Sequence, residues 1–166
     1  MTSSLDSPVT RRLDELGIGY TPIAIPLDSE RKPIRSLEES IAAHGGDPTC
    51  IVRSLVFRTG SGGFVLLAIA GGRADWVALR KHLGERRLAL AEPHEVLDAT
   101  GFPIGAVPPL ALPESIRVLV DEGVFAHKRA VIGSGVLGYA LELTGADLRL
   151  ALKEAEVGKF TKPDSK

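Results

Sequence analysis

The chain is poor in several residue types, and each shortage excludes a class of protein. A single cysteine, Cys50, stands among 166 residues, which excludes a disulfide framework and a cysteine-based metal cluster. Aromatic residues make up only 5% of the chain, so stacking platforms for nucleic acid bases are scarce. The 20 basic and 21 acidic residues leave a net charge of -1, which argues against nucleic-acid binding through overall charge alone.

Long hydrophobic runs are also missing from the sequence. No run approaches the 18 or so apolar residues of a membrane-spanning helix, and the N-terminus has no apolar stretch like that of a signal peptide. We therefore expect a cytoplasmic protein with no membrane partner. The length suits one domain covering residues 1–166, with a core of about 8–155 and a frayed tail after residue 158.

Short local signals predict five helices. Ser7 before Pro8 is a typical helix start, and Ser36 with Glu39 has the spacing of a capping box. Pro93 and Thr144 mark two further starts, and apolar residues recur at helical spacing in the remaining segment. The predicted helices cover residues 8–16, 37–44, 74–83, 93 to about 101, and 145–153.

Apolar runs between these helices predict strands. Residues 50–58 and 64–70 flank a glycine-rich segment at 60–63 that is a strong hairpin signal. Residues 20–27 are expected to form an edge segment, because their two prolines cannot donate hydrogen bonds. Further strands are expected at 87–91, 116–121, 129–132 and about 139–143. Many short strands with interspersed helices indicate a mixed α/β (α+β) domain with a curved sheet rather than a doubly wound parallel sheet.

Arg53 is the most informative residue, because it interrupts an otherwise apolar strand. On a period of two it shares a face with Ile51, Leu55 and Phe57, so a permanent cation is predicted where a hydrocarbon belongs. An unpaired buried charge is costly. Either the chain supplies a carboxylate partner, or the side chain opens into a cleft for an anionic or carbonyl-bearing ligand.

Two glycine-bearing loops are candidates for a binding site. Residues 100–109 combine glycines with prolines, and residues 133–138 place Ser134 among three glycines. Glycine lets backbone N–H groups come close to a ligand, but the same residues also suit tight corners of a barrel. The second loop matches G-x-G-x-x-G, yet a predicted strand follows it where a dinucleotide-binding motif needs a helix. A Rossmann fold is therefore disfavoured.

The densest basic cluster lies around the predicted helix at 74–83. It could receive a nucleic-acid backbone, or it could be an ordinary solvated helix face. Its members are Arg80, Lys81, Arg86 and Arg87.

The order of these elements resembles the YbaK and prolyl-tRNA synthetase associated domain family. The resemblance rests on the strand at 52–57, on Thr100-Gly101-Phe102 leading into the G-x-x-x-P stretch 105–109, and on the segment 131–143 with its glycine loop. It spans roughly residues 8–155. It implies a twisted, partly closed, barrel-like mixed sheet surrounded by helices. It also implies hydrolysis of tRNA mischarged with a small amino acid, with no cofactor and no metal. The implied partners are the aminoacylated 3′ end of tRNA and an aminoacyl-tRNA synthetase, with no role for DNA.

The resemblance also implies roles for particular residues. Arg53 would position the terminal adenosine and the ester, and Gly105 would bind or polarise the acyl carbonyl, so these two are the catalytic candidates. Water or a group of the substrate would then attack the ester. The remaining substrate-binding candidates are Ser54, Gly101, Phe102, Pro109, Gly133, Ser134 and Gly135.

Arg53 is also a departure from that family, in which lysine is usual at this position. Arginine keeps its proton near neutral pH, so it cannot act as a general base, although it can still hold a phosphate or a carbonyl. A non-catalytic binding module that keeps the pocket therefore remains an alternative to a hydrolase.

Overall fold

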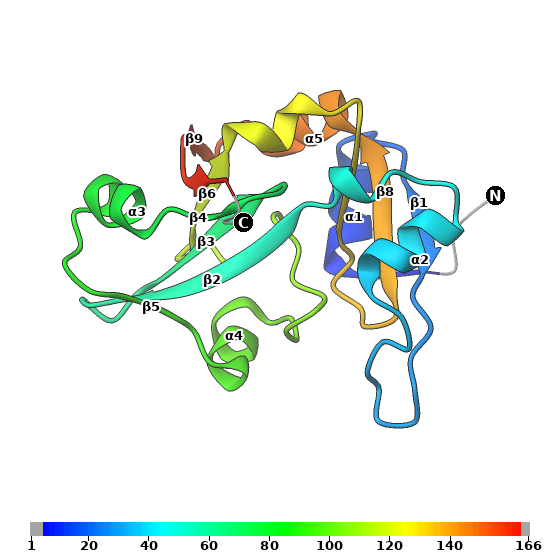
Figure 1. Ribbon diagram of the computed structural model, residues 1–166, viewed down its shortest axis with the longest axis horizontal. Coiled ribbons are helices and arrows are strands. Elements are labelled where there is room, and N and C mark those ends of the chain that lie inside the picture. The colour runs from blue at the N-terminus through cyan, green and yellow to red at the C-terminus, as the bar shows by residue number, and fades with distance from the viewer. Residues whose placement is uncertain (1–4, 164–166) are drawn as a thin grey trace.

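The computed structural model describes residues 5–163. Helices and strands alternate along this part of the chain, with short 3₁₀ turns (η) between some of them (Figure 1). The helical elements are α1 (Pro8–Glu15), α2 (Leu37–Ala43), η1 (Pro48–Cys50), α3 (Trp76–Leu83), α4 (Pro93–Thr100), η2 (Glu122–Ala126) and α5 (Gly145–Ala151). The strands are β1 (Thr21–Ala24), β2 (Arg53–Thr59), β3 (Phe64–Ile69), β4 (Arg73–Ala74), β5 (Leu88–Leu90), β6 (Arg117–Asp121), β7 (Arg129–Gly133), β8 (Tyr139–Thr144), β9 (Glu156–Gly158) and β10 (Thr161–Lys162).

The described strands form three sheets. The largest has the order β5-β2-β3-β6-β9, with antiparallel pairing from β5 to β3 and parallel pairing from β3 to β9. A second, antiparallel sheet has the order β1-β8-β7, and β10 pairs with β4 in a third. The mixed α/β fold is therefore confirmed.

The main core lies where the inner faces of the two larger sheets meet. Leu66 and Ala68 of β3 enter this core, whereas Val65, Leu67 and Ile69 enter a second cluster on the opposite face, beneath α3. Both faces of β3 are thus buried, which explains a strand that is apolar at every position. A third cluster packs α2 against the outer face of the smaller sheet. Figure 1 shows the larger sheet on the left, with α3 beyond it, and the smaller sheet with α1 and α2 on the right.

Local sequence signals predicted the starts of α1, α2, α4 and α5 correctly, whereas α3 begins at Trp76 instead of residue 74, because Ala74 belongs to β4 and Asp75 caps the helix. The Ser7 and Ser36 side chains each accept a hydrogen bond from the N3 backbone N–H, and Thr144 caps α5 in the same way. Such caps satisfy N–H groups that have no partner within the helix, and they involve residues only three positions apart. The hairpin of β2 and β3 and the edge position of β1 are likewise as predicted.

Two expectations about the fold need correction. The described strands do not close into a barrel: the two larger sheets are linked through a single bridge between Ile51 and Val131, where the Val52 N–H donates to the Val131 carbonyl over 2.7 Å. The tail was also expected to fray after residue 158. Instead Phe160 is buried in the cluster beneath α3 and β10 pairs with β4, because an aromatic side chain at this point gains from burial. Residues 164–166 lie outside the described part.

A cluster of charges holds β9 in place. The Glu156 carboxylate accepts hydrogen bonds of 2.9 and 2.6 Å from Nε and Nη2 of Arg117, and it lies 2.9 Å from Nε2 of His82. These contacts join β9 to β6 and α3. Hydrogen bonding from Arg117 lowers the pKa of the Glu156 carboxyl to about 2.

We predict that Glu156→Gln lowers the free energy of unfolding by about 1 kcal/mol at pH 7, a value reduced for the partial exposure of the pair. Because the pKa of Glu156 is lower in the folded state, its contribution is complete above the ordinary value of 4.5 and is lost as the pH falls toward 2. Urea unfolding of the wild type and of Glu156→Gln between pH 7 and pH 3 should therefore show that the difference between their free energies of unfolding becomes smaller as the pH falls. Glu154→Gln, which changes an exposed neighbouring carboxylate, is the control. If the stability difference between the wild type and Glu156→Gln did not depend on pH, the lowered pKa of Glu156 would be contradicted.

Within residues 5–163, no helix has both the length and the apolar character that a membrane crossing requires.

Candidate functional site

A small cavity joins the three sequence elements that were singled out above. It has a volume of about 180 Å³ and is lined by Arg53 and Ser54 of β2, by Gly105 of the first glycine loop, and by Gly133 at the end of β7. Tyr139, the first residue of β8, also lines it. The rest of the wall is aliphatic: Ile25, Leu37, Val52, Leu55, Val107, Val131, Ile132 and Ala140. A few polar groups in an apolar wall are typical of a ligand site.

Arg53 has a carboxylate partner at this cavity. Its Nη2 atom donates to Oε2 of Glu38 in α2 over 2.5 Å, and both side chains are about half exposed. The hydrogen bond from Arg53 lowers the pKa of the Glu38 carboxyl. An exposed ion pair contributes at most about 1 kcal/mol, so an anionic ligand could replace Glu38 at modest cost.

Arg53 lies on the same face of β2 as Leu55 and Phe57, as predicted, but the expectation that its own side chain is buried there is wrong. Pro48–Cys50 form a 3₁₀ turn capped by Asp47, so β2 begins at Arg53 itself rather than at residue 50. The side chain therefore lies at a strand end, where solvent reaches it, while Phe57 further along the same strand is fully buried. Both explanations offered for the charge apply at once, since Arg53 has a structural partner and also lines a cavity.

Ser54 contributes to the cavity wall, but its hydroxyl faces away from solvent. The Oγ atom is buried and has no hydrogen-bond partner among the described residues. An unsatisfied buried hydroxyl is unfavourable by about 1–3 kcal/mol. Rotation of the side chain would be needed before this hydroxyl could reach a ligand.

Gly105 presents a free backbone donor at the cavity. It is exposed, and no described residue accepts a hydrogen bond from its N–H group. Its φ angle of +92° lies in the left-handed region, which glycine adopts without strain. The donor is therefore available for an acceptor atom of a ligand.

Gly133 and Gly135 serve the packing of one glycine loop against the other. A Cβ atom at Gly133 would lie 2.3 Å from the Val107 carbonyl oxygen, and one at Gly135 would lie 2.9 Å from the Phe102 ring. The Gly135 N–H donates to the Ala106 carbonyl over 2.8 Å. Gly133 still lines the cavity, so only this glycine of the pair combines close packing with a place in the site.

Ser134 holds its own loop together instead of facing a ligand. It is fully buried, and its hydroxyl lies within 2.9 Å of the Val136 and Tyr139 carbonyl oxygens while accepting the Val136 N–H. Its carbonyl in turn accepts a 2.7 Å hydrogen bond from the Ser7 hydroxyl. Burial of this kind is not consistent with the expectation that Ser134 lines the substrate wall.

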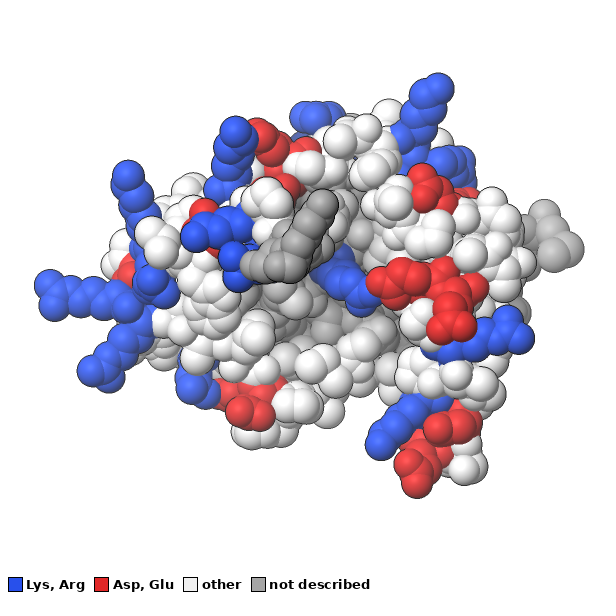
Figure 2. Space-filling view, viewed as in Figure 1, with Lys and Arg blue, Asp and Glu red and all other residues white. Residues whose placement is uncertain are grey.

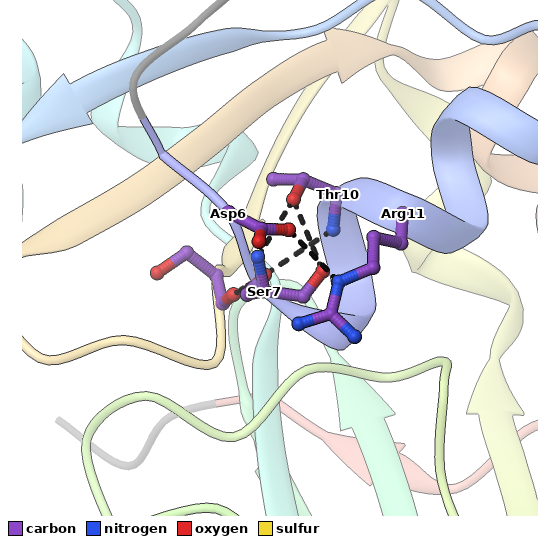
Figure 3. A network of polar contacts seen from close by, with 5 residues as sticks. Asp6, Ser7, Thr10 and Arg11 are labelled. Carbon is purple, nitrogen blue, oxygen red and sulfur yellow. Dashed lines mark hydrogen bonds and ion pairs between the residues drawn. The ribbon is translucent and has the colours of Figure 1, made fainter.

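The contact from Ser7 anchors the start of α1 to the second glycine loop. Figure 3 shows the surrounding network, in which the Ser7 N–H donates to Thr10 Oγ1, the Thr10 N–H donates back to Ser7 Oγ, and Arg11 pairs with Asp6. The serine side chain thus caps a helix and fixes a loop that borders the cavity.

The other loop candidates lie away from the cavity. Gly101 ends α4 in the left-handed conformation, and Phe102 is buried in the main core. Pro109 lines a separate, larger hollow of about 640 Å³ between α1, the start of β6 and the end of α5. That hollow touches neither Arg53 nor the site glycines, so we place the candidate site at the smaller cavity.

The basic cluster lies at the far end of the larger sheet. Arg80 and Lys81 belong to α3, and Arg86 and Arg87 precede β5. No ion pair involves these four side chains within residues 5–163. Figure 2 shows Lys and Arg side chains projecting on the left, over the region of α3 and β5, and acidic side chains on the right, near α2. The two candidate surfaces are therefore separate.

Sequence reasoning missed Tyr139, Glu38 and the aliphatic wall. Tyr139 was treated only as the start of a strand, although an aromatic residue directly after a glycine loop could have drawn attention in a chain with so few rings. Glu38 stands beside the capping-box residue Glu39 and has no sequence signal of its own, and its contact with Arg53 spans 15 positions of sequence. No local pattern signals that contact.

Comparison with known proteins gives one family. The model of the aminoacyl-tRNA editing domain matches residues 31–150. The chain is also 37% identical over 101 residues to the proline–tRNA ligase of Pseudothermotoga lettingae. These aligned residues make up 60% of this chain and 17% of that ligase. The ligase of Thermotoga neapolitana is 34% identical over 110 residues, which are 65% of this chain and 18% of that ligase. The matches thus span less than a fifth of these ligases.

Solved structures match over nearly the whole chain. The hypothetical protein APE2540 is 27% identical with a TM-score of 0.78, and the match covers 94% of this chain and 100% of that one. A protein described as a candidate trans-editing enzyme for prolyl-tRNA synthetase is 29% identical with a TM-score of 0.75, covering 95% and 99% of the two chains. This chain is therefore similar to nearly the full length of two crystallised chains as well as to a segment of the ligases.

Proposed function

The chain belongs to the aminoacyl-tRNA editing domain family, and from this premise we propose that it is a trans-editing deacylase. The proposed reaction is hydrolysis of the ester between tRNA and a wrongly attached small amino acid. The observation that carries this proposal is the cavity that joins Arg53, Gly105 and Gly133. Its volume of about 180 Å³ is below the roughly 300–1,000 Å³ of sites for drug-sized ligands, which suits a small acyl group.

The free N–H of Gly105 supports a role in stabilising the transition state. As water attacks the acyl carbon, the carbonyl oxygen gains negative charge, and a donor fixed in advance by the fold stabilises that charge. Such a donor can contribute about 3 kcal/mol. The acyl–oxygen bond then breaks, a proton passes to the departing ribose oxygen, and the free amino acid and tRNA are released.

Arg53 is proposed to hold the substrate rather than to transfer a proton. A guanidinium group stays protonated, so the proton removed from water must pass to water or to a group of the substrate. The half-exposed pair with Glu38 leaves the guanidinium close to the cavity and able to exchange partners. A phosphate or carbonyl of the aminoacylated 3′ end is the proposed replacement for Glu38.

The basic cluster of Arg80, Lys81, Arg86 and Arg87 is proposed to contact the phosphate backbone of the tRNA. This proposal is supported by two observations: the four side chains have no ion-pair partner among the described residues, and they lie on a surface apart from the cavity. Phosphate contacts give affinity without sequence readout. A synthetase as an additional partner stays a proposal that rests on the likeness to ligase segments.

A panel of mischarged tRNAs tests the proposed function. The purified protein is incubated with tRNA specific for proline, charged with alanine, glycine, serine or cysteine, and release of the amino acid is measured. The proline-specific tRNA comes first because the relatives are proline–tRNA ligases. Hydrolysis of at least one mischarged form, with the correctly charged form spared, is the expected result.

The same panel separates the deacylase from a binding module. Glu38 favours the module, because it occupies the guanidinium that a substrate would need. Measurable binding of aminoacyl-tRNA without hydrolysis of any member of a panel extended to other tRNAs would support the module and overturn the deacylase.

A further inference from the structure

Tyr139 is the single exposed aromatic residue in the part of the chain that the structure describes, with 41% of its surface accessible. Phe57, Phe102 and Phe160 are buried, and the other rings are half-buried. A lone exposed apolar side chain needs no explanation by itself. Its location does, because this residue lies on the cavity with Arg53 and Gly105.

The Tyr139 ring is also without a stacking partner among residues 5–163. Phe57 packs edge-on against Trp76, Phe160 packs against His82, and the Arg149 guanidinium lies 4.4 Å from the ring centre of Phe125. No ring or cation lies against Tyr139 in this way. Part of the Tyr139 surface at the cavity is therefore accessible and has no aromatic or cationic partner among these residues.

The neighbouring loop adds a second apolar surface. Ile104, which precedes Gly105, is 56% exposed. A Cβ atom at Gly105 would lie 3.6 Å from Leu137, so the turn at 104–105 lies against the loop that leads into Tyr139. Ile104 does not line the cavity itself, but it directly precedes Gly105, whose unpaired N–H group belongs to the same turn.

We propose that Tyr139 is the stacking platform for the terminal adenine of the tRNA. The inference rests on the proposed function, because it takes the acyl group to be in the cavity. That acyl group is esterified to the ribose of the last nucleotide, so the base must lie one sugar away, at the rim of the cavity. Stacking of a base on an aromatic ring is favourable and tolerates any base. Tyr139 therefore acts as a binding residue that sets the position of the ester relative to Gly105.

Kinetics give the first test, with the panel substrate that the wild-type protein hydrolyses. Tyr139→Leu is expected to raise KM about tenfold, equivalent to about 1.4 kcal/mol, and to change kcat much less. Tyr139→Phe keeps the ring and should retain the KM of the wild type. Because the side chain is exposed, thermal midpoints should stay close to that of the wild type for both variants. An unchanged KM in a folded Tyr139→Leu protein would overturn the proposal.

Nuclear magnetic resonance gives a second test that does not need catalysis. The chain has two tyrosines, Tyr20 and Tyr139, so ring-labelled tyrosine gives few signals, and Tyr20→Phe identifies them. Adenosine 5′-monophosphate at millimolar concentration should shift the Tyr139 signals and leave those of Tyr20 in place. Cytidine 5′-monophosphate, with a smaller ring system, should give a smaller shift. Absence of any shift at Tyr139 would contradict the stacking site.

Together the two measurements distinguish failure of this inference from failure of the proposed function. If no tRNA is hydrolysed but adenosine monophosphate shifts Tyr139, the stacking site stands and the deacylase does not. If hydrolysis is found and neither measurement responds to Tyr139, the deacylase stands and the stacking site is overturned.

Discussion

Replacing Arg53 with alanine is expected to lower kcat/KM for a mischarged tRNA about 10- to 100-fold. Hydrogen bonds to charged groups contribute about 1.5–3 kcal/mol, and the alanine variant would lose those that the guanidinium is proposed to make to a phosphate or carbonyl of the substrate. Arg53→Lys keeps the positive charge but not the planar pair of donors, so its loss should be smaller. Steady-state kinetics of the three proteins tests this, because kcat/KM should fall from the wild type to Arg53→Lys and further to Arg53→Ala.

Arg58→Ala is the matched control for this experiment. Arg58 lies on the same strand and also pairs with a helix carboxylate, since its Nη1 atom lies 2.9 Å from both oxygens of Glu95. It does not line the cavity, so its loss should leave hydrolysis unchanged. Glu38→Gln should not reduce hydrolysis either, because it releases Arg53 for the substrate. Unchanged hydrolysis by Arg53→Ala would show that the guanidinium has no part in the reaction.

The largest expected effect on stability comes from Gly133→Ala. The added Cβ would lie 2.3 Å from the carbonyl oxygen and 2.7 Å from the carbonyl carbon of Val107. Both are backbone atoms of a packed loop, so no side-chain rotation relieves the overlap. Overpacking of this kind costs about 1–3 kcal/mol, and we expect the upper end, or a melting midpoint lower by roughly 10 °C. The same shift would move Gly105 relative to Gly133 and impair the cavity.

Gly19→Ala separates this overlap from the general effect of removing a glycine. A Cβ at Gly19 would meet no atom within 4 Å, and its φ angle is outside the left-handed region. That variant should therefore be neutral or slightly more stable. Calorimetry of the two variants provides the comparison, and equal midpoints would mean that the two glycine loops are not rigidly packed.

Elements that depend on neighbours in the sequence were predicted well. Ser36 and Glu39 form their reciprocal capping box, and the glycines at 60–63 allow the hairpin of β2 and β3. Each of these interactions closes within a few residues, so the residues that make it can be read directly from the sequence. The prediction that the glycine loop at 133–138 precedes a strand, and not the helix of a dinucleotide site, succeeded for the same reason.

Elements that depend on distant partners were predicted less well. The pairing of β10 with β4 and the burial of Phe160 contradict the expected frayed tail, because their partners lie more than 75 positions earlier in β4 and α3. The predicted burial of Arg53 was wrong for a different reason. The 3₁₀ turn Pro48–Cys50 precedes β2, so the strand begins three residues later than predicted. A shift of this size changes whether a side chain lies in the strand interior or at its exposed end.

The sequence by itself determined the mixed α/β class, most element starts, and the order of motifs that resembles the editing family. Only the tertiary structure decided what each glycine and each charge does. Gly105 offers a free N–H at a cavity, Gly133 gives room to the Val107 backbone, and Arg53 faces Glu38 at the exposed end of a strand. The physical reason is that helix caps and tight turns are set by local backbone geometry. A cavity exists only where segments far apart in the chain pack together without filling the space between them.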